Sequence, residues 1–241
     1  MPDLHYTDPI LAAVYDLDSG WSEDRDFYLA LAGPPPQRIL DLGCGTGLLA
    51  EAFAGLGHQM TGVDPAAAML DVARARPLAS RISYVQSTAQ NFRSDQRFDL
   101  IIMTGHAFQV LLTDADIAAT FVTMRDHLAP NGRIVFESRN PALDWAAVWT
   151  TDRRYVLQGK TVQETRRVVS ANGNLISFDT DYVIHGECRR SSSTLLFLRA
   201  PEIAARLTAA GLQVKDLFGD WQTGSFAPDI SAEMVFVVGH G

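Results

Sequence analysis

The stretch RILDLGCGTG, residues 38–47, decides the fold of this 241-residue chain. An apolar run of strand length leads directly into glycines at positions 43, 45 and 47, and apolar residues then recur at helical spacing from Leu48 to Leu56. The pattern predicts a strand, a tight turn and a helix. Because glycine lacks a Cβ, such a turn can bend sharply and let a ligand lie against the main chain. The N-terminus of the following helix offers unpaired N–H groups, which suit a carboxylate or a phosphate.

The spacing of these glycines separates two candidate ligands. A dinucleotide fingerprint has glycine at its first, third and sixth positions, but the sixth position counted from Gly43 is Leu48. The spacing therefore disfavours NAD. The pattern Asp41-x-Gly43-x-Gly45-x-Gly47 resembles the first motif of class I methyltransferases that use S-adenosylmethionine (SAM). The alternative is a glycine-rich turn that binds no ligand.

Further strands are predicted along the chain, alternating with helices. They are expected at residues 59–64, 82–86, 98–103 and 133–137, the last after a turn at residues 130–132, with two more at 213–218 and 233–238. A helix between residues 114 and 128 is expected to be capped by Asp114. This alternation predicts an α/β fold with a doubly wound, seven-stranded, mostly parallel Rossmann-like sheet, whose carboxyl edge gathers the loops that follow the strands.

Asp64 ends the second predicted strand, next to the glycine turn, and has two interpretations. It could cap the next helix, with Pro65 at the first helical position. It could instead accept hydrogen bonds from two vicinal hydroxyls of a ribose, because an ionised carboxylate is purely an acceptor. We favour the ribose, since ligands of open parallel sheets bind at this edge.

Residues 87–92, STAQNF, follow the third strand and resemble the adenine-binding motif of the same methyltransferases, which usually reads GDAEDL. Thr88 and Gln90 replace the two acids, so contacts through Ala89 and Gln90 are favoured over a contact from Thr88. The cofactor-binding set that the resemblance implies is Asp41, Gly43, Cys44, Gly45, Gly47, Asp64, Pro65, Met69, Thr88, Ala89, Gln90, Met103 and Thr104.

Four parts of the chain are expected. Residues 1–36 carry two amphipathic helices that the resemblance makes a lid over the cofactor, and residues 37–145 form the SAM-binding core. Residues 146–199 are expected to form an inserted antiparallel lobe over the mouth of the site, with strands at 168–171, 176–184 and 194–198 and a hairpin at Asn172-Gly173. Residues 200–241 complete the core sheet.

The candidate acceptor site rests on a narrower resemblance, to glycine N-methyltransferase and related small-molecule N-methyltransferases. It lies in residues 105–108, 138–141 and 218–221. It implies that Arg139 grips a substrate carboxylate, as a guanidinium fork can. Tyr6 and His106 are further substrate-binding candidates, and His106 and Tyr15 are the candidates for a general base. The alternatives are a strand-end ion pair for Arg139, a structural histidine, and aromatic packing for the tyrosines.

Composition limits the possible partners. A formal charge of −8 and a pI near 5.1 argue against a general nucleic-acid binder, although residues 151–200 carry a charge of +3. No apolar run reaches the about 20 residues of a membrane helix, and residues 1–8 show no secretory signal. The two cysteines, Cys44 and Cys188, indicate a reducing compartment, so a cytoplasmic protein is expected. The six histidines are scattered, so no metal site is expected. A monomer or a homodimer is expected.

The sequence therefore predicts a SAM-dependent methyltransferase that acts on a small molecule, such as an amine or a carboxylate-bearing metabolite. One alternative is a catalytically idle module that binds SAM or a nucleoside as a sensor or partner subunit, since fold alone does not imply activity. A methyltransferase for RNA or protein is the third interpretation, and it requires a basic groove.

Overall fold

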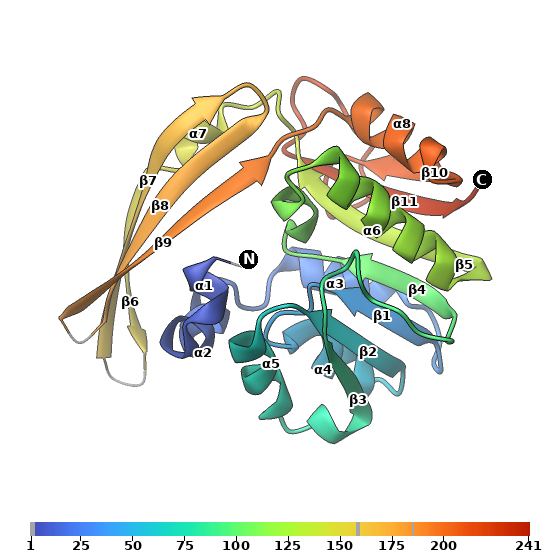
Figure 1. The fold of residues 1–241 in the computed structure, drawn as a ribbon, viewed down its shortest axis with the longest axis horizontal. Helices are drawn as coiled ribbons and strands as arrows, with labels where there is room; N and C mark the ends of the chain where they lie inside the picture. Colours follow the sequence, from blue (N-terminus) through green and yellow to red (C-terminus); the bar gives the residue numbers. More distant parts are fainter. Residues whose placement is uncertain (1–2, 158–159, 185) are drawn as a thin grey trace.

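The computed structural model describes residues 3–157, 160–184 and 186–241. Two sheets build the molecule, a seven-stranded sheet and a four-stranded sheet that projects from one side of it (Figure 1). Among the described residues, no helix has the length and apolar character needed to cross a membrane.

The seven-stranded sheet has the order β10-β11-β5-β4-β1-β2-β3. Its strands are β1 (Arg38–Leu42), β2 (Gln59–Asp64), β3 (Ile82–Gln86), β4 (Phe98–Met103), β5 (Leu128–Arg139), β10 (Leu212–Phe218) and β11 (Glu233–His240). Only β11 runs antiparallel to its neighbours. The predicted mostly parallel, doubly wound sheet is confirmed.

Helices cover both faces of this sheet because each presents one apolar face to it. On one face α6 (Asp114–His127) and α8 (Ala200–Ala209) pack through residues such as Phe121 and Leu207. On the other, α3 (Glu23–Leu31) and α4 (Leu48–Gly55) pack through Phe27, Tyr28 and Phe53. The helix α5 (Ala67–Arg74) follows β2. Strand order reverses at β1, which lies between β2 and β4, so the switch point of the sheet is at the glycine turn.

Two local predictions were wrong, one at the start of β5 and one at the N-terminus of α6. Phe98 pairs with Leu128 and Leu100 with Arg133, so residues 129–132 form a bulge inside β5 rather than a separate turn before it. The helix α6 is capped by Thr113, whose hydroxyl accepts from the Asp116 N–H at 3.1 Å, and Asp114 is its first residue. Thr113 is extended and so can cap, whereas Asp114 is already helical.

The inserted lobe is a four-stranded antiparallel sheet of order β6-β7-β8-β9, preceded by the short α7 (Trp145–Val148). The strands are β6 (Thr151–Leu157), β7 (Lys160–Asn172), β8 (Leu175–Ile184) and β9 (Glu187–Leu196). The hairpin at Asn172-Gly173 is confirmed, with Gly173 at φ +58°. The third predicted strand was placed too late in the sequence. The edge strand β6 was missed because its polar run at residues 151–154 has no alternating apolar pattern.

The N-terminal helices divide between two roles. The helices α1 (Leu4–Thr7) and α2 (Pro9–Asp18) lie between the lobe and α5 (Figure 1). Leu11 and Val14 pack on lobe residues, whereas Ala12 packs on Ala66 and Met69 of the core. The second predicted lid helix, α3, is instead part of the core, because Tyr28 is fully buried against the sheet.

Candidate functional site

A cavity of about 620 Å³ opens at the carboxyl edge of the main sheet. Its wall combines the glycine turn, the ends of β2 and β4, the loop after β3, the N-terminal segment with α1 and α2, and the lobe strand β9. Of the predicted cofactor-binding residues, those that line it are Gly43, Gly45, Asp64, Pro65, Met69, Thr88, Ala89, Gln90, Met103 and Thr104. One cavity therefore joins loops that the sequence places far apart.

The three glycines of the turn have different surroundings although all have positive φ, at +83°, +53° and +73°. A Cβ on Gly45 would meet no protein atom within 4 Å, so this position is open space in the cavity wall. A Cβ on Gly47 would lie 2.4 Å from the Tyr84 hydroxyl oxygen. Gly45 thus gives a ligand room, whereas Gly47 lets α4 approach β3. Gly47 does not line the cavity, which departs from the predicted cofactor-binding set.

Asp64 is held by two backbone groups at the cavity wall. Its Oδ2 accepts from the Gly45 N–H at 2.9 Å and its Oδ1 from the Ala66 N–H at 2.8 Å. The interpretation of Asp64 as a helix cap is wrong, because Ala66 is the N-cap and α5 begins at Ala67, beyond Pro65. Burial raises the pKa of Asp64, and the two backbone N–H groups partly oppose that rise. Each oxygen retains a lone pair for a ligand hydroxyl.

The far end of the cavity holds the predicted adenine residues and one acid that sequence reasoning missed. Gln90 donates through Nε2 to Oδ1 of Asp116 at 3.1 Å, and Asp116 lines the cavity with Thr88 and Ala89. A carboxylate therefore stands near the position where the family motif carries its own acid. Asp116 comes from α6, beyond β4, so no local motif could have indicated it.

The near end of the cavity is walled by Asp3, Tyr6 and Tyr15 of the N-terminal segment and by Ser192 and Thr194 of β9. The two tyrosine rings lie 6.1 Å apart between centroids. Burial raises the pKa of Tyr6, and the negative charges around it, including Asp64, raise it further, whereas Arg139 lowers it. Two tyrosines of the N-terminal segment therefore stand in the cavity wall that also holds Asp64.

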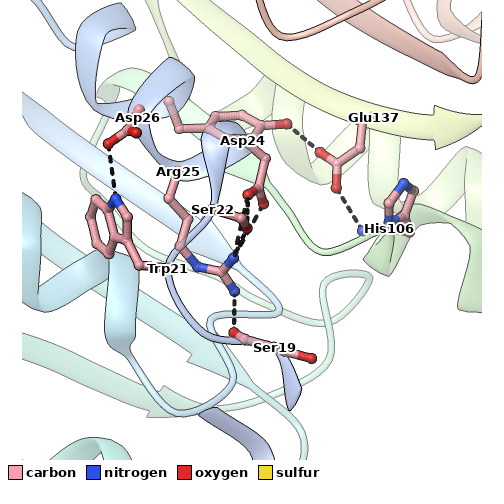
Figure 2. Close-up of polar contacts among 9 residues, drawn as sticks. Ser19, Trp21, Ser22, Asp24, Arg25, Asp26, His106 and Glu137 are labelled. Carbon is pink, nitrogen blue, oxygen red and sulfur yellow. Dashed lines mark hydrogen bonds and ion pairs between the residues drawn. The ribbon is translucent and has the colours of Figure 1, made fainter. Parts of the chain in front are cut away.

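His106 is fixed by two glutamates. Its backbone N–H donates to Oε1 of Glu137 at 2.6 Å, a contact visible in Figure 2, and its ring Nε2 lies 2.8 Å from Oε2 of Glu233. Glu137 also accepts from the Tyr28 hydroxyl. The backbone of His106 has φ +59°, a left-handed conformation that is uncommon outside glycine. Gly105 and Ala107 line the cavity but His106 is not among the described residues that do.

Arg139 is the last residue of β5, and its side chain lies beside two tryptophan rings. Its Nη1 donates to Oε1 of Gln109 at 3.0 Å, and its guanidinium carbon lies 5.0 Å from the Trp149 ring centroid and 5.7 Å from that of Trp145. Across the described parts of the chain no carboxylate lies within 4.0 Å of it, so the strand-end ion pair is wrong. Burial lowers the pKa of Arg139, and the charges of Glu233 and Glu137 oppose that change. Arg139 does not itself line the cavity.

Two further predicted cofactor residues lie beneath the turn rather than in the cavity wall. Cys44 is buried, with its sulfur against Gly62. Asp41 is 1% exposed and its Oδ1 has no hydrogen-bond partner. Burial, together with the charges of Asp64 and Glu137, raises the pKa of Asp41 to about 7, and the charge of Arg25 opposes that rise. Figure 2 shows Arg25 held among residues 19–24 of the loop before α3 and its first turn.

The donor set fits SAM better than it fits a metal. The cavity offers a glycine cradle at Gly45, an acid placed for vicinal hydroxyls at Asp64, and polar groups for a base at Gln90 and Asp116. Its volume lies within the range of small-molecule sites, about 300–1,000 Å³. In residues 3–157, 160–184 and 186–241, no three His, Cys, Asp or Glu side chains gather as a metal site would require.

Comparison with known proteins agrees with this geometry. Residues 39–132 match a family model described as a methyltransferase domain. Over 124 residues the chain is 34% identical to a ubiquinone biosynthesis O-methyltransferase of Azorhizobium caulinodans, covering 50% of this chain and 47% of that protein. The chain thus spans about half the length of that relative.

Two solved structures share the whole fold. The CcbJ methyltransferase of Streptomyces caelestis superposes with a TM-score of 0.78 at 22% identity and 96% coverage of both chains. SAM-bound CalS10, an amino pentose methyltransferase of Micromonospora echinaspora, superposes with a TM-score of 0.72 at 25% identity, covering 95% of this chain and 96% of that one.

Proposed function

We propose that this chain, whose residues 39–132 match a methyltransferase domain, is a class I SAM-dependent methyltransferase that transfers a methyl group from SAM to a small-molecule acceptor carrying an anionic group. The observation that carries this proposal is the single cavity, which joins the glycine turn and Asp64 to the lid tyrosines and the lobe. Cofactor and acceptor would then meet in this cavity, whose wall holds both Asp64 and Tyr6.

Asp64 would hold the ribose hydroxyls of SAM, Gly43 and Gly45 would let its methionine part lie against the turn, and Ala89, Gln90 and Asp116 would surround its adenine. When bound, SAM supplies an electrophilic methyl group on a sulfonium centre. The protein then has to align the acceptor and exclude water, which are the contributions that orientation and closure make to catalysis. The lid and β9, which wall the near end of the cavity, suit that task.

Arg139 would bind the anionic group of the acceptor. Arg139 is partly buried and its Nη1 bonds Gln109, so its remaining guanidinium donors are available to an anionic ligand. The rings of Trp145 and Trp149 flank the guanidinium and restrict its motion by packing and cation–π contact. The acidic chain as a whole disfavours RNA.

His106 would act as the general base for acceptors that must lose a proton. Glu233 faces ring Nε2, which favours a proton on that nitrogen and leaves Nδ1 as the acceptor atom. The left-handed backbone and the Glu137 contact set the ring position, a kind of constraint that gathers at functional sites. Such a base is needed for a hydroxyl acceptor and is dispensable for a neutral amine.

Both cysteines are free and Cys188 is exposed, which supports a reducing, cytoplasmic location as part of the proposal. Both a monomer and a homodimer are compatible with this proposal, and analytical ultracentrifugation distinguishes the two.

The deciding experiment is a transfer assay with methyl-labelled SAM against a panel of small carboxylate-bearing amines and phenols. Label transferred to a panel member, with loss of transfer to its methyl ester, supports the proposal. Tight SAM binding with no transfer to any small or macromolecular acceptor would support the idle binding module instead. Transfer to RNA or protein alone would overturn the small-molecule assignment.

A further inference from the structure

Four polar side chains from the lid and the core meet beside the glycine turn. Arg76, just after α5, donates through Nε to the Thr46 carbonyl at 2.6 Å and through Nη1 to Oε2 of Glu51 at 3.2 Å. Its Nη2 pairs with the carboxylate of Asp16 in α2. The Thr46 hydroxyl donates to the other oxygen of the same carboxylate. Both oxygens of Asp16 are therefore engaged by the core.

This cluster joins the wall of the cavity to the turn beneath it. Asp16 follows Tyr15, which lines the cavity, and Thr46 lies between Gly45 and Gly47 of the turn. The side chain of Arg76 is only 14% exposed, so its charge-assisted bonds are weakly screened by water. The apolar contact of α2 with the core is made by Ala12 and Tyr15, which pack on Ala66 and Met69.

We propose that Asp16 is a positioning residue that latches α2 over the cavity and so sets how long SAM stays bound. The inference rests on the proposed function for its ligand. With the latch closed, Tyr15 stays in the cavity wall. When the Asp16 carboxylate leaves Arg76 and Thr46, α2 keeps its packing on the lobe through Leu11 and Val14 but is no longer tied to the turn, so the cofactor can leave.

The other hydrogen bonds of the cluster do not depend on Asp16, so its role in holding α2 can be tested separately from the structure of the turn. Without Asp16, Arg76 still bonds the Thr46 carbonyl and Glu51, and Glu51 still accepts from the Leu78 N–H at 3.1 Å. Loss of Asp16 should therefore loosen the lid and leave the turn in place. A matched control is Asp71→Asn, because Asp71 is an acid on neighbouring α5 whose side chain is 76% exposed and whose only ion pair, within the described residues, is with Arg74.

Hydrogen exchange of the ligand-free protein tests the latch itself. In Asp16→Asn the amides of residues 9–18 should exchange about tenfold faster or more than in wild type, the factor expected when charge-assisted hydrogen bonds are lost. The amides of β1 and β2 should exchange as in wild type, and Asp71→Asn should match wild type throughout. Unchanged exchange of residues 9–18 would overturn the latch, as would faster exchange across the whole core.

Stopped-flow release of SAM tests the consequence. Dissociation should be about tenfold faster in Asp16→Asn, and Thr46→Val, which removes only the hydroxyl, should shift it in the same direction by less. A dissociation rate equal to that of wild type would overturn the retention role even if the lid were looser. Wild-type protein that bound no SAM would instead contradict the proposed function, and the exchange experiment would still decide the latch.

Discussion

The two ends of the cavity are built from different kinds of structure. At the cofactor end the groups come from strand ends and from backbone, namely the glycine turn, Asp64 fixed by two N–H groups, and residues 88–90. At the acceptor end they are side chains on separate elements, such as Tyr6 on α1 and Thr194 on β9, and Arg139 of β5 lies outside the cavity wall. The first end is fixed by the sheet, whereas the second depends on how the lid and lobe dock.

This difference has a consequence for specificity. A change of acceptor requires only new side chains on the lid or lobe, which leave the sheet intact. A change of cofactor would require a new turn between β1 and α4. Substitutions at the two ends should therefore affect different measured quantities, namely SAM affinity at one end and acceptor kinetics at the other.

The largest expected effect is at the turn. Gly45→Val places a branched side chain in the open space of the cavity wall, so SAM affinity should fall by a thousandfold or so, the scale of a few kcal/mol of lost contacts. The fold should lose only about 1–2 kcal/mol, from the positive φ of residue 45. Calorimetric titration and urea unfolding measure the two quantities.

Gly47→Ala is the matched substitution within the same turn. Its Cβ would strike the Tyr84 hydroxyl, so unfolding free energy should fall by more than in Gly45→Val, while the protein that remains folded should bind SAM. If Gly47→Ala lost SAM binding and kept wild-type stability, Gly47 would be the glycine that makes room for the ligand, contrary to this account.

The next effect is at His106. His106→Asn keeps a residue that tolerates the left-handed backbone but removes the ring, so kcat for a hydroxyl acceptor should fall about 100-fold, as expected for loss of a general base. The SAM dissociation constant should change little. Glu233→Gln should lower kcat less, because the ring stays and only the group that faces its Nε2 changes. Equal losses of SAM affinity and turnover in His106→Asn would leave only a structural histidine.

A smaller effect is expected at Arg139. Arg139→Met removes the cation and keeps a long stem against the tryptophans, so the acceptor KM should rise about 10- to 100-fold, as for loss of a charged hydrogen bond. The affinity for SAM should stay within twofold or so of wild type. Arg167→Met is the control, because Arg167 is an exposed arginine of the lobe whose side chain is 60% exposed. An acceptor KM unchanged by Arg139→Met would show that Arg139 does not bind the anionic group of the acceptor.

An effect of a different kind, on stability and its dependence on pH, is expected beneath the cofactor end. The folded-state pKa of Asp41, about 7, exceeds its ordinary value of 3.8, so the folded protein binds the proton more tightly than the unfolded chain. Stability should therefore fall as pH rises from about 4 to 7 and level off above, by at most roughly 4 kcal/mol from this group.

Asp41→Asn should flatten that part of the pH dependence and gain most stability at pH 8. Urea unfolding at pH 5, 6, 7 and 8 measures both. A profile as steep as that of wild type would assign the dependence to other buried acids, of which Glu137 also has a raised pKa.

The cofactor end was predictable from sequence because its signals are local. The turn at residues 43–47 and Asp64 each follow from a few adjacent residues, as does the 172–173 hairpin of the lobe. The rest depends on contacts between distant residues, such as Glu233 with His106 across 127 positions and Arg76 with Asp16 across 60. No periodicity marks such pairs. Asp116 and β6 escaped prediction for the same reason, since one is an ordinary helical acid and the other a polar edge strand.

The central claim is that the glycine turn and Asp64 bind SAM. Its most direct test is calorimetric titration of SAM and S-adenosylhomocysteine into wild type, Asp64→Ala and Asp64→Asn. We expect micromolar binding of both ligands by wild type, about 100-fold weaker binding by Asp64→Ala, and an intermediate value for Asp64→Asn, which keeps one acceptor oxygen. Wild-type protein that binds neither ligand would contradict the account.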